Sequence, residues 1–141
     1  MSTEPACILV VDDDPDVRQI CSRVLSKAGY MVLTAEDAAQ AREHIEHVAF
    51  DLLILDIHLP NEDGISLLKH VHKIHPGLPA ILITGYAAAS TVMDAIRLNV
   101  REYLCKPFTM QKLLEVVAAS LQDSKGAPKT RGDWFSRPSG W

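Results

Sequence analysis

The sequence predicts an α/β protein built on a doubly wound, five-stranded parallel sheet with helices on both faces. Five short apolar runs alternate along the chain with longer amphipathic stretches, in the order strand–helix repeated five times. Several runs are continuously apolar, which is typical of parallel strands covered on both faces. The length of 141 residues suits one domain with its own core. Right-handed crossovers between such strands place helices on both sides of the sheet.

The five predicted strands are short and mostly apolar. They are Cys7–Val11, Met31–Ala35, Leu52–Leu55, Ala80–Ile83 and Glu102–Leu104.

The first predicted helix has clear start and stop signals. Asp14 can cap its N-terminus, Pro15 suits its first turn, and Gly29 suits a left-handed exit. Its apolar stripe at helical spacing consists of Val17, Ile20, Cys21, Val24, Leu25 and Ala28.

Four further helical stripes fill the gaps between the strands. Their residues are Ala38, Ala41, Ile45 and Val48 in the second, Ile65, Leu68, Val71 and His72 in the third, Val92, Ala95 and Ile96 in the fourth, and Leu113, Val116, Val117, Ser120 and Leu121 in the fifth. We expect the third helix to stop before Pro76. The fourth should end near Asn99, which tolerates the left-handed conformation, and Thr109 should cap the fifth.

The amphipathic pattern ends near Gln122, so we expect one domain over residues 1–122 and a flexible tail or linker over residues 123–141. Four basic residues against two aspartates give this tail a net charge of +2, which leaves −6 for the remainder of a chain of net charge −4. Trp134, Phe135 and Trp141 could contact a partner, but their Gly/Ser/Pro context fits a flexible extension better.

The composition argues against several classes of protein. The acidic balance, with a pI near 5.8, argues against direct binding to nucleic acid, whose phosphates need a basic face. No apolar run approaches the roughly 20 residues of a membrane span, and the start shows no signal peptide. Cys7, Cys21 and Cys105 lie in apolar runs without a Cys-x-x-Cys motif. We therefore expect them to be small, reduced core residues of a cytoplasmic protein.

Polar residues stand directly after four of the predicted strands. Asp12, Asp13 and Asp14 follow the first strand, Asp56 the third, Thr84 the fourth, and Lys106 comes just after the fifth. Ligand sites of doubly wound sheets lie at the carboxyl ends of the strands. We therefore expect these carboxylates, the hydroxyl and the ammonium to converge.

The predicted cluster has a definite chemistry. Carboxylates packed together repel one another, and one would be protonated unless a cation lay among them. Mg²⁺ prefers oxygen ligands and keeps several waters, so a few carboxylates and a carbonyl would suffice. A carboxylate beside Mg²⁺ and a lysine is a good acceptor for a phosphoryl group.

The motifs that stand at these strand ends resemble those of a response-regulator receiver domain, of the two-component and chemotaxis-regulator type. They are Ile-Leu-Val-Val-Asp-Asp-Asp at 8–14, Leu-Leu-Ile-Leu-Asp-Ile-His-Leu-Pro at 52–60, Asp63-Gly64, Ile-Leu-Ile-Thr-Gly at 81–85 and Tyr-Leu-Cys-Lys-Pro-Phe at 103–108. The resemblance runs from Ile8 to Leu121. It implies a flavodoxin-like (βα)5 fold with strand order 2-1-3-4-5, so that residues 1–122 are a receiver domain.

The resemblance also implies a role for each site residue. Asp56 would be the phosphoacceptor, and Lys106 would pair with the phosphoryl group. Thr84 would be the switch hydroxyl and Tyr103 the switch aromatic. The Mg²⁺ ligands would be Asp13, Asp56 and the backbone carbonyl of His58. Asp13 would bind the ion directly, and Asp12 would bind it mainly through water. The Lys106–Pro107 peptide bond is expected to be cis.

The resemblance implies a signalling protein rather than a turnover enzyme. A histidine kinase or a histidine phosphotransfer protein would supply the phosphoryl group. A downstream protein would bind the face formed by the fourth helix, the fifth strand and the fifth helix. The chain could act alone or be the receiver portion of a longer hybrid kinase or transcription regulator.

Plainer interpretations apply to some of these residues. Asp14 is better explained as a helix cap than as a ligand, Thr84 could open a turn before Gly85, and Tyr103 could be a core aromatic. The pairs His44/His47 and His72/His75 lack a completed ligand set, so we expect ordinary helix-face residues. His58 stands two positions after Asp56, where a side chain could tune hydrolysis of the phosphoryl group.

Three other classes remain as alternatives. A haloacid-dehalogenase-like phosphatase could use Asp12 and Asp14, but Pro15 makes Asp14 a cap and Asp56 would have no role. A flavodoxin-like nucleotide or flavin binder lacks the expected Gly-rich loop after the first strand. A pseudo-receiver that acts only as an interaction module requires a missing site residue, and none is missing.

Overall fold

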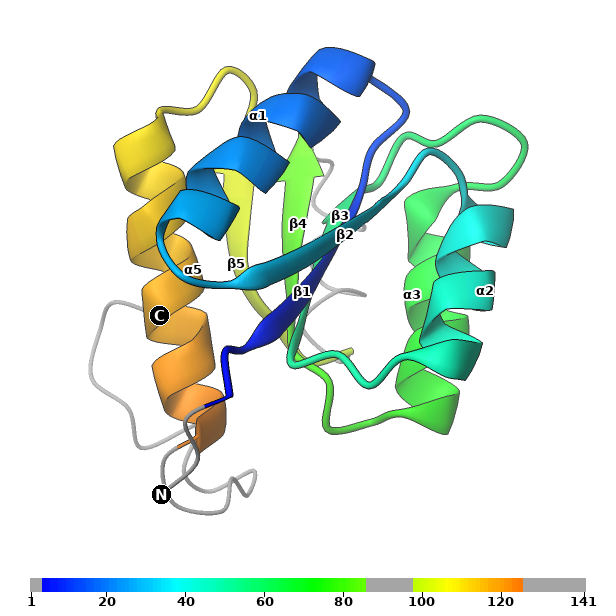
Figure 1. Cartoon of the computed structure of the whole chain (residues 1–141). Coiled ribbons are helices and arrows are strands. Elements are labelled where there is room, and N and C mark those ends of the chain that lie inside the picture. The colour runs from blue at the N-terminus through cyan, green and yellow to red at the C-terminus, as the bar shows by residue number, and fades with distance from the viewer. Residues whose placement is uncertain (1–3, 86–97, 126–141) are drawn as a thin grey trace.

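The structure, a computed structural model, describes residues 4–85 and 98–125 of the chain. In these ranges strands and helices alternate, and the strands gather into one sheet between the helices (Figure 1). The elements in chain order are β1 (Cys7–Val11), α1 (Pro15–Lys27), β2 (Met31–Ala35), α2 (Ala38–His47), β3 (Leu52–Asp56), α3 (Gly64–Ile74), β4 (Ala80–Thr84), β5 (Val100–Cys105) and α5 (Met110–Lys125). The predicted α/β class is confirmed.

The sheet has the order β2-β1-β3-β4-β5, and every neighbouring pair of strands is parallel. This confirms the predicted doubly wound, flavodoxin-like order 2-1-3-4-5. The strand order reverses at β1, because β2 lies on one side of it and β3 on the other. The carboxyl ends of β1 and β3 therefore border the crevice in which such sheets bind ligands.

Three strands extend beyond their predicted ends. β3 includes Asp56, β4 includes Thr84, and β5 runs from Val100 to Cys105. The apolar pattern ends at the last apolar residue, whereas the backbone ladder continues to the polar one, as the pairing of Asp56 with Ile83 shows. Two of the predicted site residues are thereby held by strand hydrogen bonds rather than by loops.

The start and stop signals of α1 are confirmed. The Asp14 side chain accepts a hydrogen bond from the Asp16 N–H at 2.9 Å, and Pro15 is the first helical residue. Gly29 follows the helix with a φ of +104°, a conformation that costs glycine little. Asp14 is thus a cap.

Two further turn signals are confirmed. The Thr109 hydroxyl accepts from the Lys112 N–H at 3.0 Å and so caps α5, and Asn99 adopts a φ of +65°. The predicted fourth helical stripe, residues 92–96, lies outside the described residues. None of the helices in the described ranges is long and apolar enough to cross a membrane.

Helix α5 continues three residues past the predicted domain boundary at Gln122, to Lys125. The helix can continue because none of Asp123, Ser124 and Lys125 breaks a helix, and the first glycine, Gly126, comes after them. The division into a domain over residues 1–122 and a tail over residues 123–141 stays a prediction. Residues 126–141 lie outside the described part of the chain.

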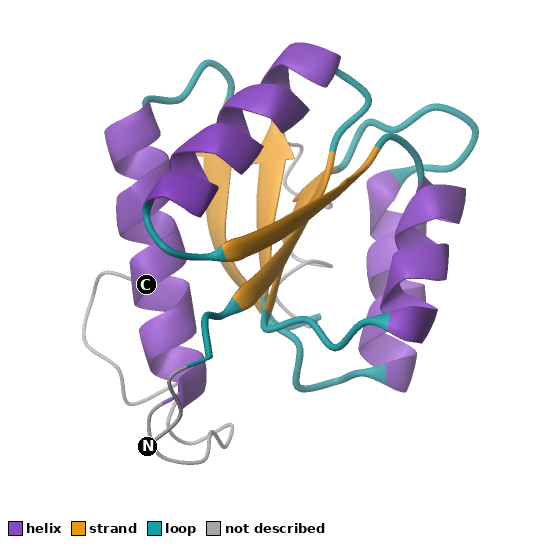
Figure 2. Cartoon of the chain, in the orientation of Figure 1, coloured by secondary structure: helices purple, strands orange, loops and turns teal. Residues whose placement is uncertain are grey.

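The sheet separates two apolar cores. Figure 2 shows α1 and α5 on one side of the strands, and α2 and α3 on the other. Because side chains alternate along a strand, Leu9 and Val11 of β1 enter the core under α2 and α3, and Ile8 and Val10 enter the core under α1 and α5.

The same alternation assigns the strand-end polar residues to faces of the sheet. Asp12 and Asp56 continue the face covered by α1 and α5, and Thr84 continues the face covered by α2 and α3. Tyr103 is half-buried and packs against the core under α2 and α3. The predicted acceptor and the predicted switch residues thus belong to opposite faces.

The prediction that all three cysteines are core residues is wrong for Cys105. Cys7 and Cys21 are buried and Cys105 is exposed, and all three are reduced. Cys105 is the last residue of β5, an edge strand of the sheet, and its side chain belongs to neither of the two buried cores.

We expect iodoacetamide at mildly alkaline pH to label Cys105 in the native protein and to leave Cys7 and Cys21 unmodified. Burial raises the pKa of the Cys21 thiol to about 11, with a further contribution from the Asp12 charge, and burial also raises the pKa of Cys7. Few thiolates then form at these two positions. Peptide mass spectrometry measures the labelling, and urea-unfolded protein, in which all three should react, is the control. Native labelling of Cys21 as fast as Cys105 would contradict the packing.

Candidate functional site

Four of the predicted site residues meet at the carboxyl edge of the sheet. One oxygen from each of Asp12, Asp13 and Asp56 lies within 4.8 Å of the others. The Lys106 Nζ lies 2.9 Å from Asp56 Oδ2 and 3.1 Å from Asp12 Oδ2. The carboxylates and the ammonium therefore lie together, as expected from their places at the ends of parallel strands.

The carboxylates differ in burial. Asp12 is fully buried, Asp56 is 3% exposed, and Asp13 is exposed. Burial raises the pKa of Asp12, and the nearby Asp56 charge raises it further, against the opposing effects of the Asp14 N–H and Lys106. The buried pair of carboxylates therefore needs compensating positive charge.

Lys106 supplies part of that charge. Burial alone would lower the pKa of its ammonium, but hydrogen bonds and charges from Asp56 and Asp12 outweigh burial and raise the pKa above its usual value. Lys106 is therefore a cation at neutral pH. The Lys106–Pro107 peptide bond is cis, as expected, and the Lys106 N–H donates to the Thr84 carbonyl at 2.9 Å.

Asp12 is held by its neighbours on two sides and keeps one oxygen for a further partner. Its Oδ1 accepts from the Asp14 N–H at 2.9 Å, and its carbonyl accepts from Arg18 Nη1 at 2.8 Å. Its buried Oδ2 is paired with Lys106 Nζ at 3.1 Å and has no other polar partner among the described residues. A buried acceptor of this kind beside two other carboxylates fits a hard divalent cation such as Mg²⁺.

Both oxygens of Asp56 are engaged. Oδ2 contacts Lys106, and Oδ1 accepts from the backbone N–H of His58 at 2.8 Å. The His58 side chain is exposed. The Thr84 side chain is buried at the end of β4, next to the strand that ends in Asp56. Tyr103, like Thr84, belongs to the other face of the sheet, and burial raises the pKa of its phenol.

Gly64 also belongs to the site, although its place in the Asp63-Gly64 motif by itself indicates no role for it. A Cβ at Gly64 would lie 2.5 Å from the Asp56 carbonyl oxygen and 2.5 Å from the Ile57 Cα. Its N–H donates to the Ile57 carbonyl at 2.8 Å. Only glycine lets α3 begin this close to the strand that carries Asp56.

Arg18 was missed as well. Its guanidinium donates to the Asp12 carbonyl at 2.8 Å and lies 3.9 Å from Glu36. Residue spacing gives only a weak signal for this contact, because it depends on how α1 packs against the end of β1.

The family model of the response regulator receiver domain matches residues 8–118. The chain belongs to this family. It is a receiver domain of the kind found in two-component response regulators, which are phosphoacceptor signalling modules.

Among relatives of this receiver domain, the transcriptional regulatory protein GlrR of Escherichia coli (strain K12) is 32% identical over 134 residues, covering 95% of this chain and 30% of GlrR. The DNA-binding transcriptional regulator NtrC of Bradyrhizobium sp. (strain RP501 Parasponia) is 36% identical over 137 residues, covering 93% of this chain and 28% of that protein. The chain thus spans less than a third of the length of these curated relatives.

Solved structures show the same fold. A CheY-like receiver domain protein from Methanospirillum hungatei JF-1 has a TM-score of 0.83 at 32% identity, covering 86% of this chain and 97% of that one. The receiver domain of NtrX from Brucella abortus has a TM-score of 0.76 at 38% identity, covering 82% and 98%.

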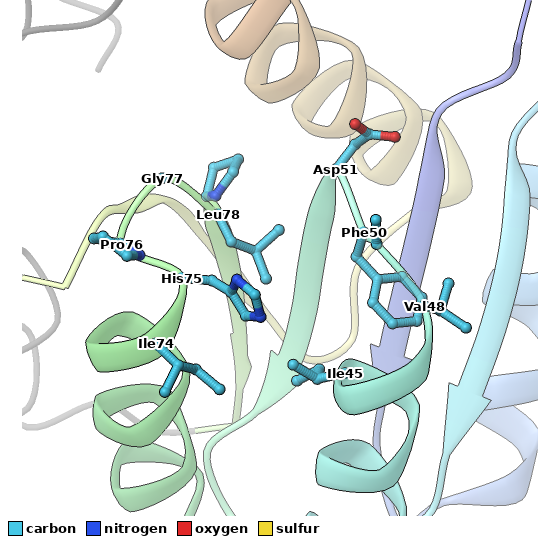
Figure 3. Close-up of a pocket in the computed structure, with 11 residues that line it drawn as sticks. Ile45, Val48, Phe50, Asp51, Ile74, His75, Pro76, Gly77 and Leu78 are labelled. Atoms are coloured by element: carbon cyan, nitrogen blue, oxygen red, sulfur yellow. The ribbon is translucent and has the colours of Figure 1, made fainter.

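A hollow of about 480 Å³ lies at the opposite end of this receiver domain, where β3 and β4 begin and α2 and α3 end (Figure 3). It contains none of the predicted site residues. Its one carboxylate, Asp51, accepts a hydrogen bond from the Cys7 N–H at 2.8 Å and therefore supports the start of β1. The hollow offers no comparable cluster of charges.

We expect Gly64→Ala to destabilise the receiver domain by about 1–3 kcal/mol, the usual effect of forcing an extra group into a packed position. The added methyl would collide with backbone atoms, which cannot turn away as a flexible side chain would. Urea unfolding followed by circular dichroism measures the loss. Gly77→Ala is the matched control, since a Cβ at Gly77 meets nothing within 4 Å. Equal stability of the two variants would contradict the close approach.

Proposed function

We propose that this receiver domain takes a phosphoryl group onto Asp56 from a histidine kinase or a histidine phosphotransfer protein, and passes the signal to a downstream protein. The observation that carries this proposal is the setting of Asp56. Its buried carboxylate contacts Lys106 at 2.9 Å and lies within 4.8 Å of oxygens from Asp12 and Asp13.

Mg²⁺ is the cofactor that suits this setting. The side chains of Asp12, Asp13 and Asp56, which each place one oxygen within 4.8 Å of the others, and the backbone carbonyl of His58 would hold it. When bound, the cation supplies positive charge that offsets the charge on the oxygens of a transferring phosphoryl group.

The transfer itself uses the Asp56 carboxylate as nucleophile. One carboxylate oxygen forms the new O–P bond while the P–N bond to the donor histidine breaks, and the imidazole leaves with that electron pair. Lys106 is placed to exchange its contact with Asp56 Oδ2 for a contact with a phosphoryl oxygen. The backbone N–H of His58 keeps the carboxylate oriented through Oδ1.

The switch is proposed to cross the sheet. Thr84, at the end of the neighbouring strand, would donate to a phosphoryl oxygen, and Tyr103 would turn into the space that Thr84 leaves. The partner surface would be the face of the predicted fourth helix, β5 and α5. A partner that binds only the phosphorylated arrangement shifts the population toward it.

The phosphatase alternative has less support. It needs Asp14 as a second catalytic carboxylate, but the Asp14 side chain accepts from the Asp16 N–H as the cap of α1. The relatives that are named as transcriptional regulators favour a longer regulator, with this chain as its receiver portion.

We expect Asp56→Asn to abolish phosphoryl uptake from a small-molecule phosphodonor in the presence of Mg²⁺, because an amide is not a nucleophile for phosphorus. Phosphorylation is measured by intact-protein mass, and circular dichroism checks that the fold is kept. Asp14→Asn is the matched control, since asparagine also caps helices. Persistent labelling of Asp56→Asn at the wild-type level would refute the assignment.

We expect His58→Ala to shorten the half-life of the phosphorylated form by about tenfold, which corresponds to about 1.4 kcal/mol of barrier. The exposed imidazole stands two residues after the acceptor and would shield the phosphoryl group from water. Decay of the phosphorylated mass after removal of the donor measures the half-life. His70→Ala, an exposed histidine on α3, is the control. An unchanged half-life in His58→Ala would show that the His58 side chain does not shield the phosphoryl group.

A further inference from the structure

The loop between β3 and α3, residues 57–63, carries His58 and must hold it in place. The ends of the loop are fixed, because the Ile57 N–H donates to the Ile83 carbonyl at 3.2 Å and the Gly64 N–H donates to the Ile57 carbonyl at 2.8 Å. These two hydrogen bonds leave the middle of the loop to be held by other contacts.

The middle of the loop adopts an uncommon conformation. Asn61 has a φ of +69°, and the Glu62 N–H donates to the Pro60 carbonyl at 2.7 Å across it. A hydrogen bond between residues two apart around a positive φ is the rarer and more strained form of γ-turn. Such turns persist where surrounding contacts enforce them.

A side-chain contact from α2 reaches Glu62, the residue that follows Asn61 in this turn. Two nitrogens of the Arg42 guanidinium, Nη1 and Nη2, pair with the two carboxylate oxygens of Glu62, twenty residues along the chain. The parallel, two-pronged geometry fixes direction as well as distance. It also raises the pKa of Arg42 and lowers the pKa of Glu62, mainly through these hydrogen bonds.

Helix α2 is a firm base for this contact. Ala38, Ala41 and Ile45 are buried in the core under α2 and α3, so the helix carrying Arg42 cannot shift easily. Both partner side chains remain partly in solvent, 35% exposed for Arg42 and 26% for Glu62. Ion pairs so exposed contribute little to global stability. The consequence of this ion pair is therefore local.

We propose that Arg42 is a positioning residue for the Asp56 site: through Glu62 it holds the loop in the conformation that places the His58 backbone against Asp56 and toward the metal. This inference rests on the proposed function, since it assigns the His58 carbonyl to Mg²⁺. Arg42 itself contacts neither the carboxylates of the site nor Lys106 in any described interaction.

Isothermal titration of the whole chain with MgCl2 tests the proposal, using Arg42→Gln, Glu62→Gln and the double variant. We expect each to weaken Mg²⁺ binding by roughly 3- to 10-fold, at or below the lower end of what outer residues of metal sites contribute. The double variant should be no weaker than either single variant, because both remove the same contact. Urea unfolding midpoints should stay close to wild type.

The sign of the Arg42→Gln effect separates positioning from simple charge. Removing a positive charge would by itself strengthen binding of a cation, whereas loss of the loop contact weakens it. Arg23→Gln, which removes the same charge from an exposed position of α1, is the matched control and should not weaken binding. Exchanging the two charges, Arg42→Glu with Glu62→Arg, should restore at least part of the affinity.

Amide hydrogen exchange of the metal-free protein gives a second readout. The N–H groups of His58, Glu62 and Gly64 should exchange several-fold faster in Arg42→Gln, with the core strands unchanged. Wild-type Mg²⁺ affinity in Arg42→Gln would overturn the inference, whatever the exchange rates. Wild-type exchange rates at these three amides would overturn it too. Failure of the proposed function is distinguishable, because the wild-type protein itself would then bind no Mg²⁺ and take up no phosphoryl group.

Discussion

Two carboxylates buried side by side at the end of an apolar sheet are the constraint on which the rest of this structure depends. Asp12 and Asp56 each end a run of Val, Ile and Leu residues with no exposed surface or almost none. Burying a charge is costly unless it is paired and hydrogen-bonded. The strands cannot move into solvent to avoid this free-energy cost of burial, since burial of their apolar residues drives folding. The protein must therefore bring cations and donors to the carboxylates.

Several neighbouring segments supply positive charge or hydrogen-bond donors to these carboxylates. The residue after β5 brings the ammonium of Lys106, and the turns after β1 and β3 direct backbone N–H groups at the carboxylate oxygens. These donors are backbone groups or a lysine at a strand end, so their positions follow from the fold itself. The negative charge that these groups leave uncompensated suits a hard cation, such as the Mg²⁺ of the proposed function. The arrangement that offsets the buried charge would then also serve phosphoryl transfer.

Much of this arrangement could be predicted from the sequence because its signals are local. Continuous apolar runs marked the strands, and Asp14, Gly29 and Thr109 marked helix ends by their own conformational preferences. Parallel strands then bring their carboxyl ends together, so Asp56 and Lys106 could be paired without any contact being known. The parts that could not be predicted depend on packing between distant segments.

Three particular residues show where prediction from sequence ends. The need for glycine at Gly64 depends on how closely α3 approaches β3. The contact of Arg42 with Glu62 depends on how α2 faces a loop twenty residues along the chain. Neither feature produces a periodic pattern in the sequence. Cys105 lies in an apolar run but is exposed at the end of an edge strand, and the run itself does not show which strand lies at the edge. The end of α5 at Lys125 is not marked in the sequence either, because polar residues that do not break a helix resemble the start of a tail.

The two-faced sheet has a consequence for how such a domain evolves. Asp56 belongs to the layer of α1 and α5, while Thr84 and Tyr103 belong to the layer of α2 and α3, and the two cores share no side chain. Because no side chain is shared, a substitution that repacks one core leaves the packing of the other core in place. Under the proposed function, selection can therefore alter the surroundings of Thr84 and Tyr103 without repacking the layer that carries Asp56, and a duplicated copy of the domain can diverge in one layer while it keeps the other.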